Sequence, residues 1–257
     1  MTKFIRLKTI LVRGLTMGMV HFLGLSGLYY APHLGVGLFS LFVFLSLFRV
    51  FIASVGLHRY FAHASFKLSK PAEIIIALLS TLLVQNPILW WVERHRKHHA
   101  YAGGEGGNDP HDSKRGFFYS HIGWLLLDVR QTDDAWVKDL NKNKTVYWFS
   151  KLTLPINLFA LGVCYYSLSY PVFCLVFVAP ILMSWHLMFS LNSICHSFGS
   201  RENPLKDSST NVKALMILTM GESLHNNHHA KPRSVNFAFR KGEWDLSYRI
   251  LKLLRVV

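Results

Sequence analysis

Residues 34–63 read LGVGLFSLFVFLSLFRVFIASVGLHRYFAH, a long apolar run followed by the first pair of closely spaced histidines. Its first part, 34–57, is apolar, contains no proline and has Arg49 as its one charged residue. Roughly 20 apolar residues in a helix are enough to cross a hydrocarbon layer of about 30 Å. The stretch therefore predicts a membrane-spanning helix that ends beside His58 and His63, two residues of a type that binds transition metals.

Four further apolar stretches occur, at 14–32, 71–92, 152–169 and 171–195. A crossing by 71–92 would separate the histidines before it from those after it, so we expect this segment to lie in the interface or against the domain. Gln85, Asn86 and Pro87 interrupt it, and Trp90 and Trp91 are typical of an interface. The prediction is an all-α integral membrane protein with four transmembrane helices, at 14–32, 34–57, 152–169 and 171–195.

The distribution of Lys and Arg predicts the orientation. The connections at 31–34 and 168–171 contain none, whereas the N-terminal tail and the segments 58–151 and 196–257 are rich in them. By the positive-inside rule these rich segments, and both termini, are cytoplasmic. We expect one domain over 1–257, in which a cytoplasmic helical part caps the four helices. The net charge of +14 favours anionic lipid headgroups as partners, and no motif for nucleic-acid binding is present.

Eight of the 14 histidines fall into three blocks, HRYFAH (58–63), HRKHH (95–99) and HNNHH (225–229). On an α-helix the positions i, i+3 and i+4 share one face, so HRKHH and HNNHH are each expected to present three nitrogens together. His58 and His63 are five apart, which predicts a helix end or a distorted helix between them. One metal ion rarely takes more than about six ligands, so eight histidines suggest two metals.

Two alternatives to a two-metal site remain open on the sequence alone. Unrelated surface histidines would leave the three blocks far apart in space. A membrane metal carrier or a bis-histidine haem carrier would line a path through the spans with histidines. Both alternatives conflict with blocks that all adjoin the same predicted membrane face.

The ordered blocks resemble those of the integral-membrane fatty-acyl desaturases, in particular the delta-9 branch and its bacterial members. The resemblance covers about 46–250 and rests on GLHRYFAH (56–63), HRKHH (95–99), DPH (109–111), RGFFYSHIGW (115–124), NSICH (192–196) and GESLHNNHH (221–229). It implies two Fe²⁺ ions, O₂ as oxidant, and a ninth histidine ligand, His196, with Asn192 reaching a metal through water. The expected metal ligands are His58, His63, His95, His98, His99, His196, His225, His228, His229 and, through water, Asn192.

Further positions are expected around that centre. Carboxylates are the usual partners that orient a metal-bound imidazole, and Glu222 and Asp109 are the candidates here. The resemblance implies a substrate tunnel between the second span and the 71–92 segment, which points to Ser46, Val50, Gln85 and Trp91. The headgroup candidates are Arg94, Arg115 and Trp124, of which the two arginines could pair with a phosphate.

The implied reaction places a cis double bond, of delta-9 position, into a long-chain acyl group carried by coenzyme A or by a membrane lipid. Hydroxylases and ketolases of the same superfamily are the enzymatic alternative. No flavin or nicotinamide fingerprint is present, so electrons are expected from a separate ferredoxin, or from cytochrome b5 with its reductase. The expected location is a bacterial inner membrane, with the active site on the cytoplasmic side.

Overall fold

The structure is a computed structural model that describes residues 3–104 and 107–257, with the side chains from residue 6 onward. The described residues form helices and loops without a β-strand, and two isolated bridges join Ser200, Asn211 and Leu224. The predicted all-α class is confirmed in this respect.

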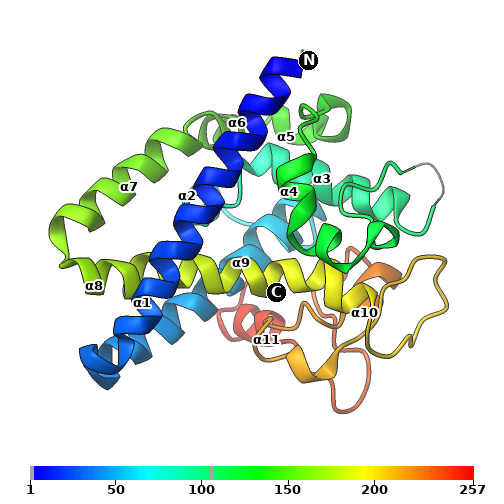
Figure 1. Cartoon of the computed structure of the whole chain (residues 1–257). Helices are drawn as coiled ribbons and strands as arrows, with labels where there is room; N and C mark the ends of the chain where they lie inside the picture. Colours follow the sequence, from blue (N-terminus) through cyan, green and yellow to red (C-terminus); the bar gives the residue numbers. More distant parts are fainter. Residues whose placement is uncertain (1–2, 105–106) are drawn as a thin grey trace.

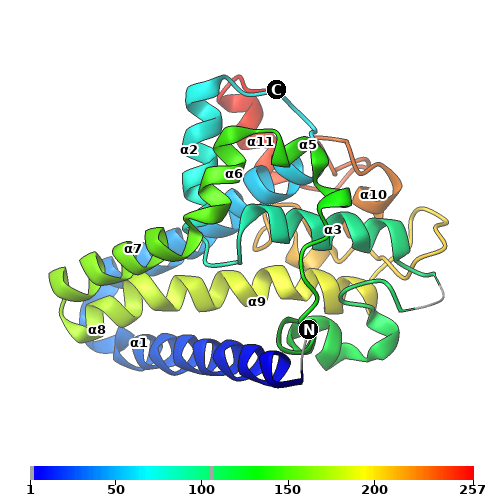
Figure 2. The same cartoon turned by 90° about the horizontal axis from the view of Figure 1, so that it is seen from above.

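The first element, α1 (Lys3–Ile52), is interrupted by a break at Gly35, where φ is 82° and ψ is 162°. Glycine accepts this conformation without a steric penalty. The ribbon of α1 folds back on itself, so its two parts form a helical hairpin (Figures 1 and 2). The second part continues directly into η1 (Ala53–Ala62), a π-helix, and this continuation carries HRYFAH.

A second hairpin is built from α7 (Thr153–Ser167), α8 (Tyr170–Phe173), η5 (Cys174–Val178), α9 (Ala179–Ser193) and η6 (Ile194–His196). The α9 and η5 segments pack against α1 at two glycines. A Cβ on Gly27 would lie 2.4 Å from the carbonyl oxygen of Cys174, and one on Gly24 would lie 2.8 Å from Leu182. In contrast, no residue of α7 is buried.

By length and composition, two helices within the described residues could cross a membrane, Arg6–Ala62 and Tyr170–His196. A third is possible if α6 (Lys144–Lys151) and α7, which bend by 59° at their junction, form one span. The structure thus supports a helical membrane protein but does not give four separate spans. The difference arises because α1 is helical on both sides of the break at Gly35, with no loop between its two parts.

The 71–92 segment is broken where the sequence predicts. The helix α2 (Lys70–Thr81) has 12 residues, about 18 Å at 1.5 Å per residue, which is too short to cross a bilayer. Val84 and Asn86 then take positive φ values, and Pro87 precedes α3 (Ile88–Tyr101). The end of the apolar segment is therefore the start of the helix that carries HRKHH.

The remaining elements gather at one end of the long helices, around α3 (Figure 1). The α-helical ones are α4 (Trp124–Leu127), α5 (Lys138–Asn141), α10 (His225–Ala230) and α11 (Leu246–Leu253). Short η turns complete them, at Ser113–Arg115, Tyr119–Gly123, Asp134–Trp136 and Lys213–Leu215. The largest apolar core joins η1, α2 and α3, and the histidine blocks lie beside it.

Candidate metal centre

The π-helical end of α1 brings His58 and His63 to one side. A π-helix closes its hydrogen bonds between residues five apart, and the amide of His63 donates to the carbonyl of His58 at 3.1 Å. The two imidazole centroids are 5.0 Å apart. The prediction that a distorted helix links this pair is confirmed.

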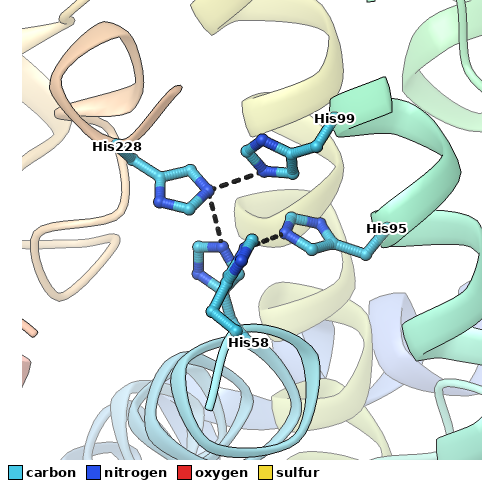
Figure 3. A group of neighbouring side chains, drawn as sticks. His58, His95, His99 and His228 are labelled. Carbon is cyan, nitrogen blue, oxygen red and sulfur yellow. Dashed lines mark hydrogen bonds between the residues drawn. The ribbon is translucent and has the colours of Figure 1, made fainter. Parts of the chain in front are cut away.

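The histidines of all three blocks form two groups, each with its ligand atoms within 4.8 Å of one another. Site A contains His58, His63, His95, His99 and His228. Site B contains His98, His196, His225 and His229. The sites adjoin each other, because the rings of His99 and His229 are 4.3 Å apart. Figure 3 shows His58, His95, His99 and His228 of site A converging from η1, α3 and α10.

The expectation that each HxxHH block presents three nitrogens to one place is wrong. In α3, His95 and His99 point to site A and His98 points to site B. In α10 the roles are exchanged, because His225 and His229 point to site B and His228 points to site A. Neighbouring side chains on a helix diverge by about 100°, so positions i+3 and i+4 can serve different ions. Each block therefore bridges the two sites.

Three carboxylates contact the outer nitrogens of these imidazoles. Glu222 lies 2.5 Å from Nδ1 of His58, Asp109 lies 3.0 Å from Nδ1 of His98, and Asp207 lies 2.9 Å from Nδ1 of His229. A carboxylate at Nδ1 holds the proton there and leaves Nε2 as a lone pair. The Nε2 atoms of these histidines are therefore free to act as ligands.

Glu222 is itself held by a buried network. Its Oε1 accepts from Ser54 and pairs with Arg59, whose other amino group donates to Asp245 at 2.8 Å. Burial alone would raise the pKa of Glu222, but the charge of Arg59 and the hydrogen bonds from His58 and Ser54 outweigh it and lower the pKa to about 2. The carboxylate is therefore ionised and rigidly placed.

Several imidazoles of the two sites are held in the neutral form. Burial, followed by the repulsion of neighbouring imidazoles, lowers the pKa of His95, His99, His225 and His228 well below the usual value of histidine. Burial also lowers the pKa of His229 to about 4, although Asp207 opposes this shift. Neutral imidazole is the form that binds metal ions.

The Nε2 atoms within each site lie very close to one another, and a bound cation would explain this arrangement. Nε2 of His228 lies 2.9 Å from Nε2 of His58 and 2.8 Å from Nε2 of His99. Nε2 of His225 likewise lies 3.1 Å from Nε2 of both His196 and His229. A single proton on the central nitrogen can satisfy only one of its two neighbours.

A metal ion satisfies such a set of lone pairs together. Ligand nitrogens about 2.1 Å from an ion, at adjacent corners of an octahedron, lie about 3.0 Å apart. The observed spacings of 2.7 Å (His63 to His95) to 3.1 Å match this edge. Nε2 of His98, in site B, is buried and has no hydrogen-bond partner among the described residues. The residues present thus fit one ion in each site.

A cavity of about 470 Å³ opens directly onto the two sites. His58 and His95 of site A and His98 and His225 of site B line it. Of the predicted tunnel and water-bridging residues, Gln85, Trp91 and Asn192 also line it. Ser46 and Val50 are buried but are not among the lining residues. Ser46 donates to the carbonyl of Phe42, and Val50 belongs to the apolar core.

The three headgroup candidates lie in different surroundings. Arg94 is buried and pairs with Glu93 and Asp128, so its charge is already neutralised. Trp124 is buried, lines the cavity and stacks on Trp90 at 5.7 Å. Arg115 is exposed, lies over the ring of Tyr119 and does not line the cavity.

Sequence reasoning missed some contacts of the centre. Asp207 lies in a loop with no fixed spacing from a histidine block. Its partner His229 could not be identified without the fold. His111 lies 4.2 Å from His98, ring to ring, and joins it and Asp109 in a third group of possible ligands. This group shares His98 with site B, and Asp109 faces Nδ1 of His98, so it supports site B and is not a separate site.

The fold and the two histidine sites define the class of this protein, a helical membrane protein with two adjoining histidine clusters that could each hold a metal ion. The sequence pattern of one family, described as fatty acid desaturase, matches residues 32–241. The chain belongs to the fatty acid desaturase family.

Curated relatives agree with this assignment. The sn-1 stearoyl-lipid 9-desaturase of Synechocystis is 32% identical over 207 residues, which cover 79% of this chain and 64% of that protein. The Delta-9 desaturase-like 5 protein of Arabidopsis thaliana is 34% identical, with 96% of this chain and 82% of the relative covered. An Acyl-CoA Delta(11) desaturase of Spodoptera littoralis is 31% identical, with 85% and 68% covered. This chain thus spans slightly less than two thirds of the Synechocystis relative.

Proposed function

We propose that this protein is an O₂-dependent acyl desaturase that introduces a cis double bond at the delta-9 position of a long-chain acyl group. One observation carries the proposal: two adjoining sites of buried and half-buried imidazoles open onto one cavity. The relatives named as stearoyl-lipid 9-desaturases support the regiochemistry. Because relatives named for lipid-bound and for coenzyme A-bound substrates both match, the names leave the carrier open.

Two iron ions would be held by the residues of sites A and B, with Asn192 contributing through water to site B. Bound iron would activate O₂, which supplies the oxidising power that side chains lack. In the overall reaction, O₂ accepts two hydrogens from the acyl chain and two electrons with two protons from a donor, and leaves as water. All-nitrogen ligation also suits other ions, so iron is part of the proposal.

The residues of this chain would position the acyl chain and exclude water from the cavity. The cavity holds the acyl chain against the Nε2 side of both sites, and position then selects the carbons that react. Gln85 and Trp91 line the cavity where α2 and α3 meet, the expected place for the wall that fixes the chain. Glu222, Asp109 and Asp207 would keep the imidazole rings oriented. Ser46 and Val50 stay predictions as more distant tunnel residues.

We propose four membrane spans: the two parts of α1 on either side of Gly35, the α7 helix, and the α8 to α9 segment. This topology is supported by the helical hairpins and by the absence of Lys and Arg at 31–34 and 168–171. This topology puts the histidine sites of the single domain, and both termini, on the cytoplasmic side of the membrane. In a bacterium this would be the inner membrane. A separate ferredoxin or cytochrome b5 system would deliver electrons to the basic cytoplasmic face.

Expression in a host that lacks its own unsaturated fatty acids tests the proposal. Wild-type protein should produce a monounsaturated acid, identified by gas chromatography with double-bond location. His98→Ala and His228→Ala, which remove one ligand from each site, should abolish it. Persistence of the product in both variants, or an alcohol or ketone in place of the olefin, would refute desaturation.

A further inference from the structure

The cavity does not end at the histidines. Trp185, Met188 and Phe189 of α9 also line it, and we call this side the α9 floor. Two other parts of the chain form the walls at its rim. One wall is the start of α1, with Val12 and Thr16. The other wall is the junction of α6 and α7, with Lys151 and Leu154. We refer to these four rim residues, Val12, Thr16, Lys151 and Leu154, as the lateral portal.

The lateral portal faces outward into apolar surroundings. Val12 is 54% exposed and Leu154 is 67% exposed, although both also line the cavity. Each belongs to a helix surface rich in exposed apolar residues. On α1 these include Leu11, Leu15 and Met19, and on α7 they include Leu158, Phe159 and Val163. Large exposed apolar surfaces of this kind mark contact with a membrane.

The second wall lies at the bend between α6 and α7. The helices meet at 59°, with the junction at Lys151 to Thr153, all of which lie at or beside the cavity. No residue of α7 is buried, so the described part of this helix does not close over the α9 floor. Figure 1 shows α7 standing apart from the first part of α1. Because Val12 of α1 and Leu154 of α7 both line the cavity and are exposed, we place its opening between these two predicted membrane helices.

The charges around the cavity suit a weakly charged carrier. Its described lining contains three cations, Arg13, Arg94 and Lys151. Arg94 is neutralised by Glu93 and Asp128, and Arg13 donates to the carbonyls of Leu125 and Asp128. Lys151 lies 5.7 Å from the ring of Tyr147 and forms no ion pair with a carboxylate in the described part of the chain. Arg13 uses only Nη1 in its bonds to the two carbonyls and keeps its charge, so two cations, Arg13 and Lys151, are available. Two cations suit the single phosphate of a lipid better than the several phosphates of coenzyme A.

We propose that the acyl substrate is carried by a membrane glycerolipid and that its chain slides sideways from the bilayer through the lateral portal. This inference rests on the proposed function of the cavity as the acyl site. The headgroup remains at the interface near Lys151, whose long side chain reaches headgroup level. The acyl chain lies over Trp185 and Met188 and reaches the histidine sites without leaving apolar surroundings.

Photocrosslinking tests the route without requiring turnover. The purified full-length chain is reconstituted in dioleoyl-phosphatidylcholine vesicles that contain a phosphatidylcholine with a diazirine near the end of one saturated acyl chain. After illumination, mass spectrometry should find adducts on residues 185–192 of the α9 floor as well as on the outer helix faces. Adducts on the outer faces alone would overturn the proposal.

Paired variants test the portal. Val12→Trp combined with Leu154→Trp should reduce the adducts on 185–192 severalfold. The control combines Leu15→Trp with Leu158→Trp, at exposed positions of the same helices outside the cavity lining, and should leave the adducts unchanged. Equal labelling of both variants would overturn lateral access, provided that both melt at the wild-type temperature.

A parallel arm uses diazirine-labelled stearoyl-coenzyme A. If it labels 185–192 in both variants, and excess stearoyl-coenzyme A displaces the lipid probe, the carrier is the water-soluble thioester and the proposal fails. A failure of the proposed desaturase function would give a different result. The wild-type chain would then produce no olefin in cells, whatever the crosslinking shows.

Discussion

Nδ1 of His58 lies 2.5 Å from Oε2 of Glu222, although the two residues are 164 positions apart in the chain. Through this contact a buried carboxylate on the loop before α10 orients an imidazole on the π-helix after α1. We predict that Glu222→Gln destabilises the fold by about 3–5 kcal/mol, because it leaves the buried Arg59 without one of its charged partners. Chemical denaturation in detergent measures this change.

A control for Glu222 lies in the same segment of the chain, between η6 and α10. Glu202 is only partly buried and lies 3.6–3.9 Å from Arg240 and Lys213. Glu202→Gln should change stability by no more than about 0.5 kcal/mol. Similar effects of the two substitutions would contradict the role given to Glu222.

Asp207 provides a gentler test of carboxylate orientation, because it lies near the surface and contacts His229 of site B. Asp207→Asn should weaken metal binding at site B by about 10–100-fold, while the apo-protein keeps its stability within about 1 kcal/mol. Competition with a chelator of known affinity measures the first quantity, and thermal melting the second. Unchanged chelator competition would show that Asp207 does not hold the ring of His229.

The packing of α1 on η5 predicts opposite effects for two glycines. Gly27→Ala should destabilise the protein by about 1–3 kcal/mol, because the added carbon would meet the backbone of Cys174. Gly18→Ala, on the same helix with no atom within 4 Å of the added carbon, should be neutral or stabilise by up to about 1 kcal/mol. Thermal melts that rank the variants in the reverse order would contradict this packing.

Glu73 connects three elements, because it accepts from Tyr60 at 2.9 Å, Asn143 at 3.0 Å and Lys70 at 2.5 Å. Burial raises the pKa of Glu73, but these donors outweigh it and lower the pKa below its usual value. A lowered folded-state pKa stabilises the fold above the unfolded pKa of about 4.3, and this stabilisation is lost as the pH falls. Glu73→Gln should be less stable than wild type by about 1–2 kcal/mol at pH 7. The difference in stability between the two proteins should shrink toward pH 3 in denaturation curves. A difference that stays constant with pH would disprove stabilisation by the ionised Glu73.

The sequence was sufficient for the helical class, the histidine blocks and the distorted helix between His58 and His63. It was insufficient for the division of ligands, because His98 and His99 are neighbours in sequence but point to different sites. Helical periodicity gives directions around one helix, whereas the partner of each nitrogen depends on where α3, α10 and η1 meet.

Contacts made by loops could not be predicted from the sequence either. Asp207 meets His229 only because the 197–224 loop returns past α10, and nothing in its spacing indicates this. Arg94 had the charge expected of a headgroup contact, but Asp128, 34 residues later, neutralises it. The predicted number of spans differs from the number of candidate helices for a similar reason, since the sequence does not indicate that α1 stays helical on both sides of the break at Gly35.

Metal content per folded chain shows whether two metal ions occupy sites A and B. Elemental analysis of detergent-purified protein, grown with iron and treated with a mild chelator, should find about two iron ions in wild type. His228→Ala and His225→Ala, which damage site A and site B respectively, should each retain about one, and His111→Ala should retain both. One ion or none in correctly folded wild type, or the same content in all four proteins, would contradict the account.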